Sequence, residues 1–212
     1  MLSSMLTEIL RGSMISASLI IAIGAQNLFV LKQGLLKNHI FFVAGICFIC
    51  DFTLMTIGIW GVGAFISRNP IITDVLAILG ALFLIWYGFN ACKSAIQGNS
   101  TMQIDSTQQQ KNALTKVILS TLAVTLLNPH VYLDTIVIVG GIAGTLSTEQ
   151  KWAFLIGAVC VSFIWFFGIG YGARLLIPLF KQKRMWVILD SIVGVVMFYI
   201  AYRLIFYIIY GS

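Results

Sequence analysis

The chain alternates between long apolar stretches and short polar ones. An apolar stretch of about 18 residues or more is long enough to cross a bilayer as a helix. By this measure the pattern predicts six transmembrane helices, at residues 13–31, 40–66, 71–92, 117–141, 152–177 and 186–207. We therefore expect an all-α integral membrane protein, in which the first apolar stretch is retained rather than cleaved as a signal peptide.

One polar segment is longer than the others. Residues 97–111, QGNSTMQIDSTQQQK, are rich in Gln, Ser and Thr and show no apolar periodicity, which is typical of a flexible connector. The connector divides a single transmembrane domain, residues 1–212, into halves at about 1–96 and about 112–212, each with three predicted spans. Halves with an odd number of spans face opposite ways, as in the inverted repeats of many secondary transporters. The stretches GAQN in span one and LNPH in span four occupy comparable places.

Composition supports this picture and excludes several classes of function. Of the 212 residues, 59% are hydrophobic and 9% are charged, whereas about 25% are charged in a soluble domain. The mean hydropathy is +0.99. The net charge is +6, but the basic residues lie mainly between the predicted spans. They therefore indicate orientation in the membrane rather than a nucleic-acid-binding surface, and the expected macromolecular partner is the lipid bilayer.

The distribution of Lys and Arg predicts the orientation. Basic residues concentrate in cytoplasmic loops. Those that follow spans one, three and five are Lys32, Lys37, Lys93, Lys111, Lys116, Lys181, Lys183 and Arg184. Fewer lie on the other side, at Arg11, Arg68 and Lys151. With six spans, the first group is expected in the cytoplasm and both termini outside. Loss of a terminal span would move one terminus inside.

Two carboxylates lie at membrane depth, Asp51 in the second predicted span and Asp134 in the fourth. An ionised side chain near the bilayer centre costs about 2.5–3.5 kcal/mol on insertion scales. Neither aspartate has a basic partner in its own predicted helix. A carboxyl that stays protonated, or that hydrogen-bonds to a neighbouring helix, would explain one such residue. Two of them beside helix-breaking residues favour a functional site.

The stretch LNPHVYLD, residues 127–134, predicts a break in the fourth span. Pro129 has no N–H, so an upstream carbonyl loses its helical partner, and Asn128 is pushed away from helical angles. A broken helix presents free carbonyls to a cation and free N–H groups to an anion. His130 and Asp134 are four residues apart and would share a face of the following half-helix. The alternative is a simple proline kink with a packing histidine.

A second weak point lies in the first span, at IGAQNLF. Gly24 weakens a helix there and permits close approach of the backbone. Gln26 and Asn27 are adjacent amides that must find hydrogen-bond partners in an apolar environment. Either they join neighbouring helices or they bind a ligand.

The remaining polar residues carry weaker indications. Arg174 and Asp190 flank the loop between spans five and six at similar depth, and we expect them to form an ion pair. Cys47 and Cys50 form a CxxC pair in span two, where we expect small buried side chains rather than a zinc or redox site. The sequence carries no visible nucleophile–base pair or HExxH motif. It therefore predicts neither an enzyme nor a resident metal or cofactor.

Five stretches of the chain belong together as a pattern: GAQNLFVLKQG, CDFTLMTIGIWG, WYGF, TLLNPHVYLDTIVIVG and SFIWFFG, which spread from residue 24 to about residue 168. In these stretches the chain resembles the LysE family of basic amino-acid exporters. The resemblance implies a multi-pass carrier in the bacterial cytoplasmic (inner) membrane that expels L-arginine or L-lysine. It also implies that the membrane potential or a proton gradient drives export.

The resemblance assigns roles to residues already singled out. The family's two intramembrane aspartates correspond to Asp51 and Asp134. Its turn in span one corresponds to Gly24, Gln26 and Asn27, and its break in span four corresponds to Asn128 and Pro129. Family members usually read P-x-G-P-Q-N in the first span, whereas this chain has Ala22 and Ala25 in place of the two prolines. Its first break therefore has to rest on Gly24 and the neighbouring amides.

We hypothesise that the protein is a secondary-active exporter of L-arginine, L-lysine or both. The substrate would bind near the membrane midplane at the two broken helices, through Asp51, Asp134, Asn128, Gln26, Asn27, Gly24, Pro129 and His130. The carboxylates would bind the positive side chain, and the half-helix N-termini would bind the α-carboxylate. The alternative is export of another small solute, either a neutral amino acid such as threonine or a divalent metal cation. A homo-oligomer is compatible with both hypotheses.

Overall fold

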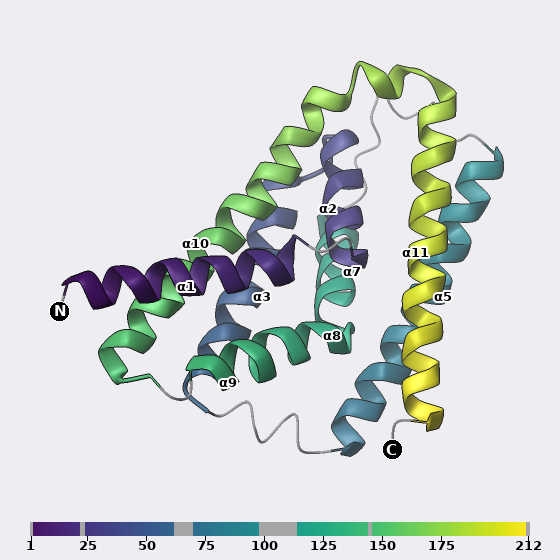
Figure 1. Ribbon diagram of the computed structural model, residues 1–212. Helices are drawn as coiled ribbons and strands as arrows, with labels where there is room; N and C mark the ends of the chain where they lie inside the picture. Colours follow the sequence, from purple (N-terminus) through teal and green to yellow (C-terminus); the bar gives the residue numbers. More distant parts are fainter. Residues whose placement is uncertain (1, 22–23, 62–69, 98–113, 144–145, 211–212) are drawn as a thin grey trace.

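The computed structural model describes residues 2–21, 24–61, 70–97, 114–143 and 146–210. Every regular element in these residues is helical (Figure 1). The first half of the chain contains α1 (Leu2–Ile20), α2 (Ala25–Leu35), α3 (Ile40–Ile59) and α5 (Pro70–Gln97). The second half contains α7 (Leu114–Leu126), α8 (Pro129–Tyr132), the π-helix η2 (Leu133–Val139), α9 (Gly140–Ala143), α10 (Thr148–Gly172), two short 3-10 segments (Ala173–Leu176 and Leu179–Lys181) and α11 (Lys183–Tyr210).

Four of the predicted spans correspond to single helices, and two are broken. α3, α5, α10 and α11 each cover most of one predicted apolar stretch. The first predicted span is bent: α1 ends at Ile20, and α2 begins at Ala25 and leaves it at an angle of 81°. The fourth span breaks after Leu126, as Pro129 predicts. Almost all of the predicted connector, residues 97–111, and the end of the second span lie outside the described residues.

Length and apolar composition identify three described helices that are able to cross a membrane, Ile40–Ile59, Thr148–Leu176 and Lys183–Arg203. The bent pair of α1 and α2 makes a fourth if the two helices form one span. The segments Ala81–Ile96 and Asp134–Ala143, and helix α7, are also apolar but shorter. The chain is therefore a multi-pass helical membrane protein, and the count of six spans stays a prediction.

Helices α1 and α10 pack backbone against backbone across the two halves of the chain. A Cβ atom on Gly12 would collide with the carbonyl of Phe154. A Cβ atom on Gly157 would likewise collide with the carbonyl of Ile9. The hydroxyl of Ser13 donates a hydrogen bond to the carbonyl of Gly157 at 3.1 Å. Dispersion contacts and hydrogen bonds, rather than the hydrophobic effect, join helices within a membrane, and small residues let the backbones approach.

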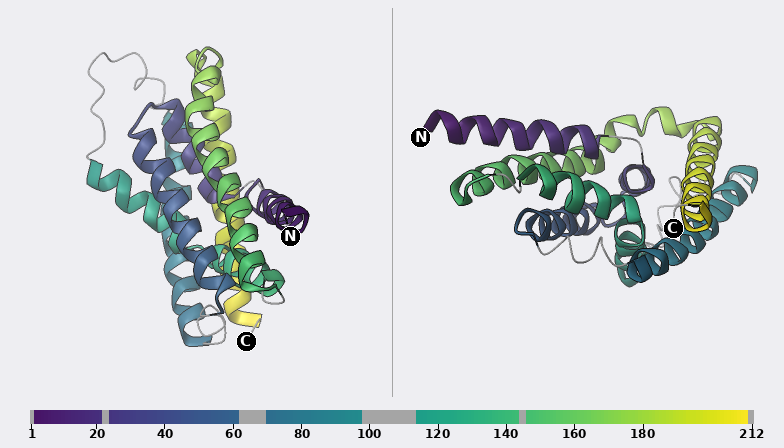
Figure 2. Two further views of the ribbon diagram at one scale, coloured as in Figure 1. Left: turned by 90° about the vertical axis from the view of Figure 1, so that its left-hand side faces the viewer. Right: turned by 60° about the horizontal axis from the view of Figure 1, so that its bottom comes forward.

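A second close approach joins α3 to the segment after the fourth-span break. A Cβ atom on Gly58 would meet the carbonyl oxygen of Thr135 at 2.6 Å, and one on Gly140 would meet that of Gly58 at 2.5 Å. α5 and α11 form a third pair and run side by side (Figure 1, Figure 2). Helices from the two halves therefore interleave, and each half covers packing faces of the other.

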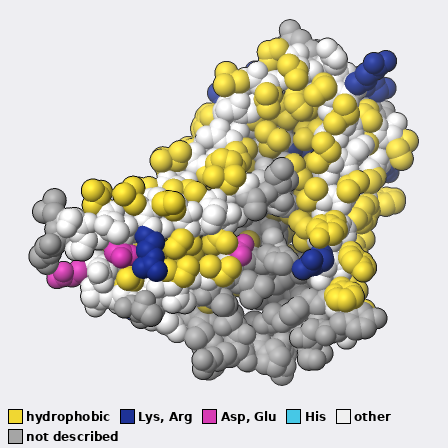
Figure 3. All heavy atoms as spheres, viewed as in Figure 1, with side chains coloured by type: hydrophobic (Ala, Val, Ile, Leu, Met, Phe, Trp, Pro, Cys, Tyr) yellow, Lys and Arg dark blue, Asp and Glu magenta, His cyan; other side chains and the backbone are white. Residues whose placement is uncertain are grey.

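Apolar side chains cover much of the described outer surface, as Figure 3 shows for one face. Leu82, Phe89, Ile164 and Leu175 are each more than 60% exposed, at 61%, 64%, 68% and 83%. Charged side chains are few on the face that Figure 3 shows. A large apolar exterior of this kind indicates contact with lipid.

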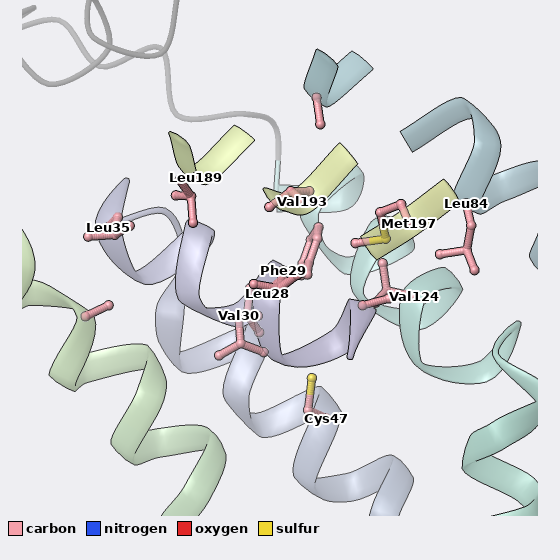
Figure 4. Close-up of a cluster of buried hydrophobic side chains, with 14 of the residues drawn as sticks. Leu28, Phe29, Val30, Leu35, Cys47, Leu84, Val124, Leu189, Val193 and Met197 are labelled. Atoms are coloured by element: carbon pink, nitrogen blue, oxygen red, sulfur yellow. The ribbon is translucent and has the colours of Figure 1, made fainter. Parts of the chain in front are cut away.

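The interior cluster is centred on α2, the short helix after the first break. Phe29 is 2% exposed and packs within a cluster that includes Leu84 of α5, Val124 of α7, and Val193 and Met197 of α11 (Figure 4). α2 therefore connects α5, α7 and α11 through apolar contacts.

The expected ion pair between Arg174 and Asp190 is wrong. Asp190 pairs instead with Lys32 of α2, with Nζ and Oδ1 2.5 Å apart. The guanidinium of Arg174 lies over the ring of Tyr171, 4.9 Å from its centre. The physical reason is the bend after α1, because it places α2 beside α11 and brings Lys32 to the aspartate.

Candidate functional site

The first helix break lies at Gly24, as predicted. Gly24 has extended backbone angles, φ −129° and ψ 177°, and precedes the first residue of α2. Any residue can adopt this conformation, so the break does not require glycine for its φ angle. The side-chain amide of Asn27 donates a hydrogen bond to the carbonyl of Ile20 at 2.7 Å. It thereby satisfies one of the carbonyls left free at the end of α1.

The second break lies at Asn128 and Pro129, also as predicted. Pro129 is the first residue of α8, a position at which the missing N–H removes no helical hydrogen bond. The hydroxyl of Tyr132 donates to the carbonyl of Leu126 at 2.8 Å. A side chain from beyond the break therefore caps the carbonyl end of α7. The side chains of Pro129 and His130 lie outside the described part of the structure.

The helix that follows this break includes a π-helical segment, which the sequence pattern did not predict. It spans Leu133–Val139 and contains Asp134 and Thr135. π-helical turns are rare and often occur at functional sites. The α-helical spacing on which the predicted common face of His130 and Asp134 depends ends at Tyr132.

A cavity of about 290 Å³ lies where the two breaks meet. This volume is near the lower end of the range of about 300–1,000 Å³ for small-molecule sites. The cavity is lined by Gly24, Gln26 and Asn27 from the first break, Asp51 from α3, Asn128 from the second break, and Asp134 and Thr135 from the π-helix. Six of the eight predicted site residues therefore line one space, although they come from separate parts of the chain.

Asp51 is the most deeply buried carboxylate of the cavity. It is 3% exposed and accepts a hydrogen bond from the hydroxyl of Ser162 at 2.9 Å. A hydrogen bond to a charged group contributes about 1.5–3 kcal/mol, which offsets part of the free-energy cost of burying a carboxylate. Asp134 reaches the same cavity from the π-helix, while Met55 and Phe166 provide apolar walls. Carboxylates between apolar walls attract a cation more strongly than they would in bulk water.

Helix α10 supplies two polar contacts that sequence reasoning missed. Ser162 donates to Asp51, and the indole N–H of Trp165 donates to the side-chain carbonyl of Asn27 at 3.2 Å. Ser162 and Trp165 are three residues apart and therefore lie on the same helix face. Both belong to the stretch SFIWFFG, which the sequence marked only as a family likeness. A hydroxyl and an indole on one face of an apolar span were the available signal.

The side chain of Gln26 has an unused hydrogen-bond donor. Its amide nitrogen is buried and has no oxygen or nitrogen acceptor among the described residues, and its side chain has only the thiol of Cys47 as a weak polar neighbour. An unpaired buried donor costs about 1–3 kcal/mol, so such a group calls for a reason. Gln26 lines the cavity and belongs to the first turn of α2. A donor beside a helix N-terminus is suited to bind an anionic oxygen.

The described residues contain no group of three or more His, Cys, Asp or Glu side chains placed to hold a metal ion. Cys47 and Cys50 are buried free thiols, in agreement with the expectation of small buried side chains. The cavity instead combines carboxylates, amides and a helix N-terminus with apolar walls. This combination suits reversible binding of a small ligand that carries charges of both signs.

Comparison with known proteins identifies the family. Residues 17–207 match the family model of the LysE type translocator. The arginine exporter protein ArgO of Salmonella typhimurium is 37% identical over 200 residues, with 94% of each chain covered. The arginine exporter protein ArgO of Klebsiella pneumoniae is 36% identical with the same coverage. No solved structure matches this chain. The chain therefore belongs to the LysE family of translocators and is a multi-pass membrane transporter rather than an enzyme.

Proposed function

We propose that this protein exports cationic amino acids, L-arginine or L-lysine, across the bacterial cytoplasmic membrane by secondary active transport. The observation that carries the proposal is the cavity between two helix breaks, with Asp51 and Asp134 in its walls. The relatives named as arginine exporters support the same substrate class.

The carboxylates recognise the positive end of the substrate. A guanidinium group presents a planar fork of N–H donors that matches carboxylate oxygens, and an ammonium group presents three donors. Ser162 holds one oxygen of Asp51 and so orients the carboxylate. Met55 and Phe166 contact the aliphatic stem of the substrate from the apolar walls. A neutral amino acid brings no positive charge to the carboxylates, so its binding does not offset the cost of keeping them in an apolar site.

The first break recognises the α-carboxylate of the substrate. The first N–H groups of a helix have no helical partner and favour an anion. α2 has 11 residues, whereas α8 has four before the π-helix begins. The N-terminus of α2, with the amide nitrogen of Gln26 beside it, is therefore the better carboxylate site. Asn128 orients the substrate from the opposite break.

Two related halves provide alternating access. Each half begins with a broken helix, and the broken helix of each half packs against the next long helix of the other half: α1 against α10, and the π-helix against α3. This exchange supports an inverted repeat of two three-span halves. Rocking of the halves around the shared cavity would expose it to one side and then the other. The membrane potential or a proton gradient drives the net export.

Efflux from loaded cells tests the substrate. Cells without other basic amino-acid exporters are loaded with radiolabelled arginine as a dipeptide, and efflux is measured with and without this protein. Lysine, citrulline, threonine and Cd²⁺ are tested in parallel. Citrulline is the matched control, because it retains the shape of arginine and replaces the guanidinium by a neutral urea. Efflux of arginine or lysine without citrulline supports the proposal, and efflux of threonine or Cd²⁺ alone would contradict it.

Variants of the two carboxylates test the site. Loss of one partner of a buried charge pair costs about 2–5 kcal/mol, so Asp51→Asn and Asp134→Asn should each lower arginine efflux roughly 30-fold or more at equal membrane levels. The matched control is Glu149→Gln, an exposed acidic residue in the first turn of α10. Full activity of the Asp134→Asn protein would exclude Asp134 from the binding site.

A further inference from the structure

A second cavity lies beside the candidate site, and the proposed function does not use it. It has a volume of about 280 Å³ and opens between α2, α5 and α7. Its polar lining consists of Lys32, Gln33, Tyr87, Asn90, Ser94, Lys116 and Ser120. The described lining includes two lysines and no acidic residue. Its charge is therefore the reverse of the charge in the cavity that holds Asp51 and Asp134.

Helix α2 connects the two cavities. Gln26 in its first turn lines the candidate site, and Phe29, Lys32 and Gln33 line the second cavity. With a rise of about 1.5 Å per residue, Gln26 and Gln33 are roughly 10 Å apart along the helix axis. Phe29 lies between them, and its ring is 5.8 Å from that of Tyr87 of α5. Phe29 and Tyr87 therefore form an aromatic layer at the end of the second cavity that lies toward Gln26, and Phe29 is packed among apolar side chains such as Val193 and Met197 (Figure 4).

The ion pair of Lys32 and Asp190 joins α2 to α11 about one helical turn after Phe29. The two side chains are 14% and 1% exposed. It joins two helices, whereas the pair of Glu8 and Arg11 lies within α1. A buried ion pair adds little net stability, because the cost of desolvation offsets the attraction between the charges. The pair instead fixes the position of α11 relative to α2, since α11 packs chiefly on α5 and meets α2 over a small contact.

We propose that the pair of Lys32 and Asp190 is a latch that holds α11 and α5 against α2. The latch keeps the layer of Phe29 and Tyr87 closed, and the second cavity is the vestibule through which the candidate site opens to one side of the membrane. When the pair separates, α5 and α11 move away from α2 and the two cavities join. This proposal rests on the proposed function in one respect, that the protein transports a solute, and it does not depend on which solute is exported.

Thiol labelling from water measures this access. In the full-length protein the four natural cysteines are replaced, and Val193→Cys places a single thiol in the closed layer, where Val193 is 0% exposed. The latch is removed by Lys32→Met together with Asp190→Asn, which leaves no unpaired buried charge. We expect a water-soluble, charged methanethiosulfonate to react roughly fivefold faster or more, as a shift of about 1 kcal/mol in the closed state implies.

Two controls define the cause of faster labelling. The charge swap Lys32→Asp with Asp190→Lys should return the rate to near that of the protein with the latch intact. Arg11→Ala breaks the other described ion pair, within α1, and should leave the rate unchanged. Unchanged labelling without the latch overturns the proposal. A faster rate that the charge swap fails to reverse also overturns it, because packing rather than charge would then hold the layer closed.

A cross-link gives a second measurement that does not require the latch to be removed. Lys32→Cys and Asp190→Cys joined by a short bis-methanethiosulfonate should abolish efflux of whichever solute the protein exports, and reduction should restore it. Continued efflux from the cross-linked protein overturns the latch. If arginine is not exported but loss of the latch still speeds labelling and the charge swap still reverses it, only the proposed substrate is overturned. Failure of the latch proposal and failure of the proposed substrate are therefore distinguishable.

Discussion

At the scale of single residues, polar side chains in an apolar protein are divided between structural and ligand-binding work. Asn27 donates to the end of α1 and accepts from Trp165, so both ends of its amide are used within the protein. Its neighbour Gln26 has a buried amide nitrogen without an oxygen or nitrogen acceptor among the described residues. Asp51 is held by Ser162. Adjacent residues with the same chemistry therefore have different tasks, which follow from the helices that face them.

The two amides allow a paired prediction. Asn27→Leu leaves the carbonyl of Ile20 and the indole of Trp165 without this partner, at about 1–3 kcal/mol for each group. The midpoint temperature of thermal unfolding in detergent should therefore fall by several degrees, at roughly 2–4 °C per kcal/mol of lost stability. Gln26→Leu removes an unpaired donor, so it should leave the unfolding temperature unchanged or raise it while weakening arginine export. Equal loss of stability in both variants would contradict the division of tasks.

Ser162 gives a separate prediction about position. Ser162→Ala removes the hydrogen bond to Asp51 and should raise the KM for the exported amino acid roughly tenfold, the equivalent of about 1.5 kcal/mol. Ser162→Thr keeps the hydroxyl and should recover most of the affinity. The measurement is KM and maximal rate of efflux at matched membrane levels. An unchanged KM in the alanine variant would show that Ser162 does not position the carboxylate.

At the scale of elements, the two helix breaks have different causes. The second break follows from local covalent structure, because Pro129 cannot continue a helix from α7 and instead begins α8. The first break has no proline among its described residues. The backbone leaves the helical conformation at Gly24, which has extended angles. The bend is stabilised by the hydrogen bond that Asn27 donates to the carbonyl of Ile20 and by the one that it accepts from Trp165. Tertiary contacts therefore replace steric restriction at the first break.

The glycine contacts between helices give a prediction at the same scale. Gly12→Leu and Gly157→Leu each place a side chain where the carbonyl of the facing helix lies, and overpacking of this kind costs about 1–3 kcal/mol. Each variant should unfold roughly 2–12 °C lower in detergent. Gly168→Leu on α10 is the matched control, because a Cβ atom there meets nothing within 4 Å. A control that unfolds as low as the other two would refute the role of the glycine contacts.

At the scale of the whole molecule, helices of each half pack mainly against helices of the other half. α1 of the first half lies on α10 of the second, α3 lies on the π-helix, and α5 pairs with α11 (Figure 2). The candidate cavity takes its walls from both halves. Neither the packing faces nor the cavity are complete in one half, so we expect both halves to be needed to form the site.

Separation of the halves tests this organisation. The chain is divided after Thr107, within the predicted connector, and residues 1–107 and 108–212 are expressed alone and together. Because the glycine faces of α1 and α10 cover each other, we expect each half alone to be degraded and the pair to accumulate and restore export. Stable accumulation of one half without the other would show that it folds independently and would contradict the interleaved arrangement.

The residue order alone was sufficient for the membrane class, the all-helical architecture, both helix breaks and six of the residues that line the cavity. These follow from hydropathy, from proline stereochemistry at the second break, from Gly24 and its neighbouring amides at the first, and from the cost of carboxylates at membrane depth, all of which can be read from short segments of chain. The 81° bend, the π-helix at Asp134, the contact of Ser162 with Asp51 and the pairing of Asp190 with Lys32 rather than Arg174 were not accessible in this way. The partners in the last two contacts are more than 100 residues apart, and no local pattern encodes which helices face each other. Packing of small residues between helices chooses those neighbours, and it thereby decides which buried charge meets which partner.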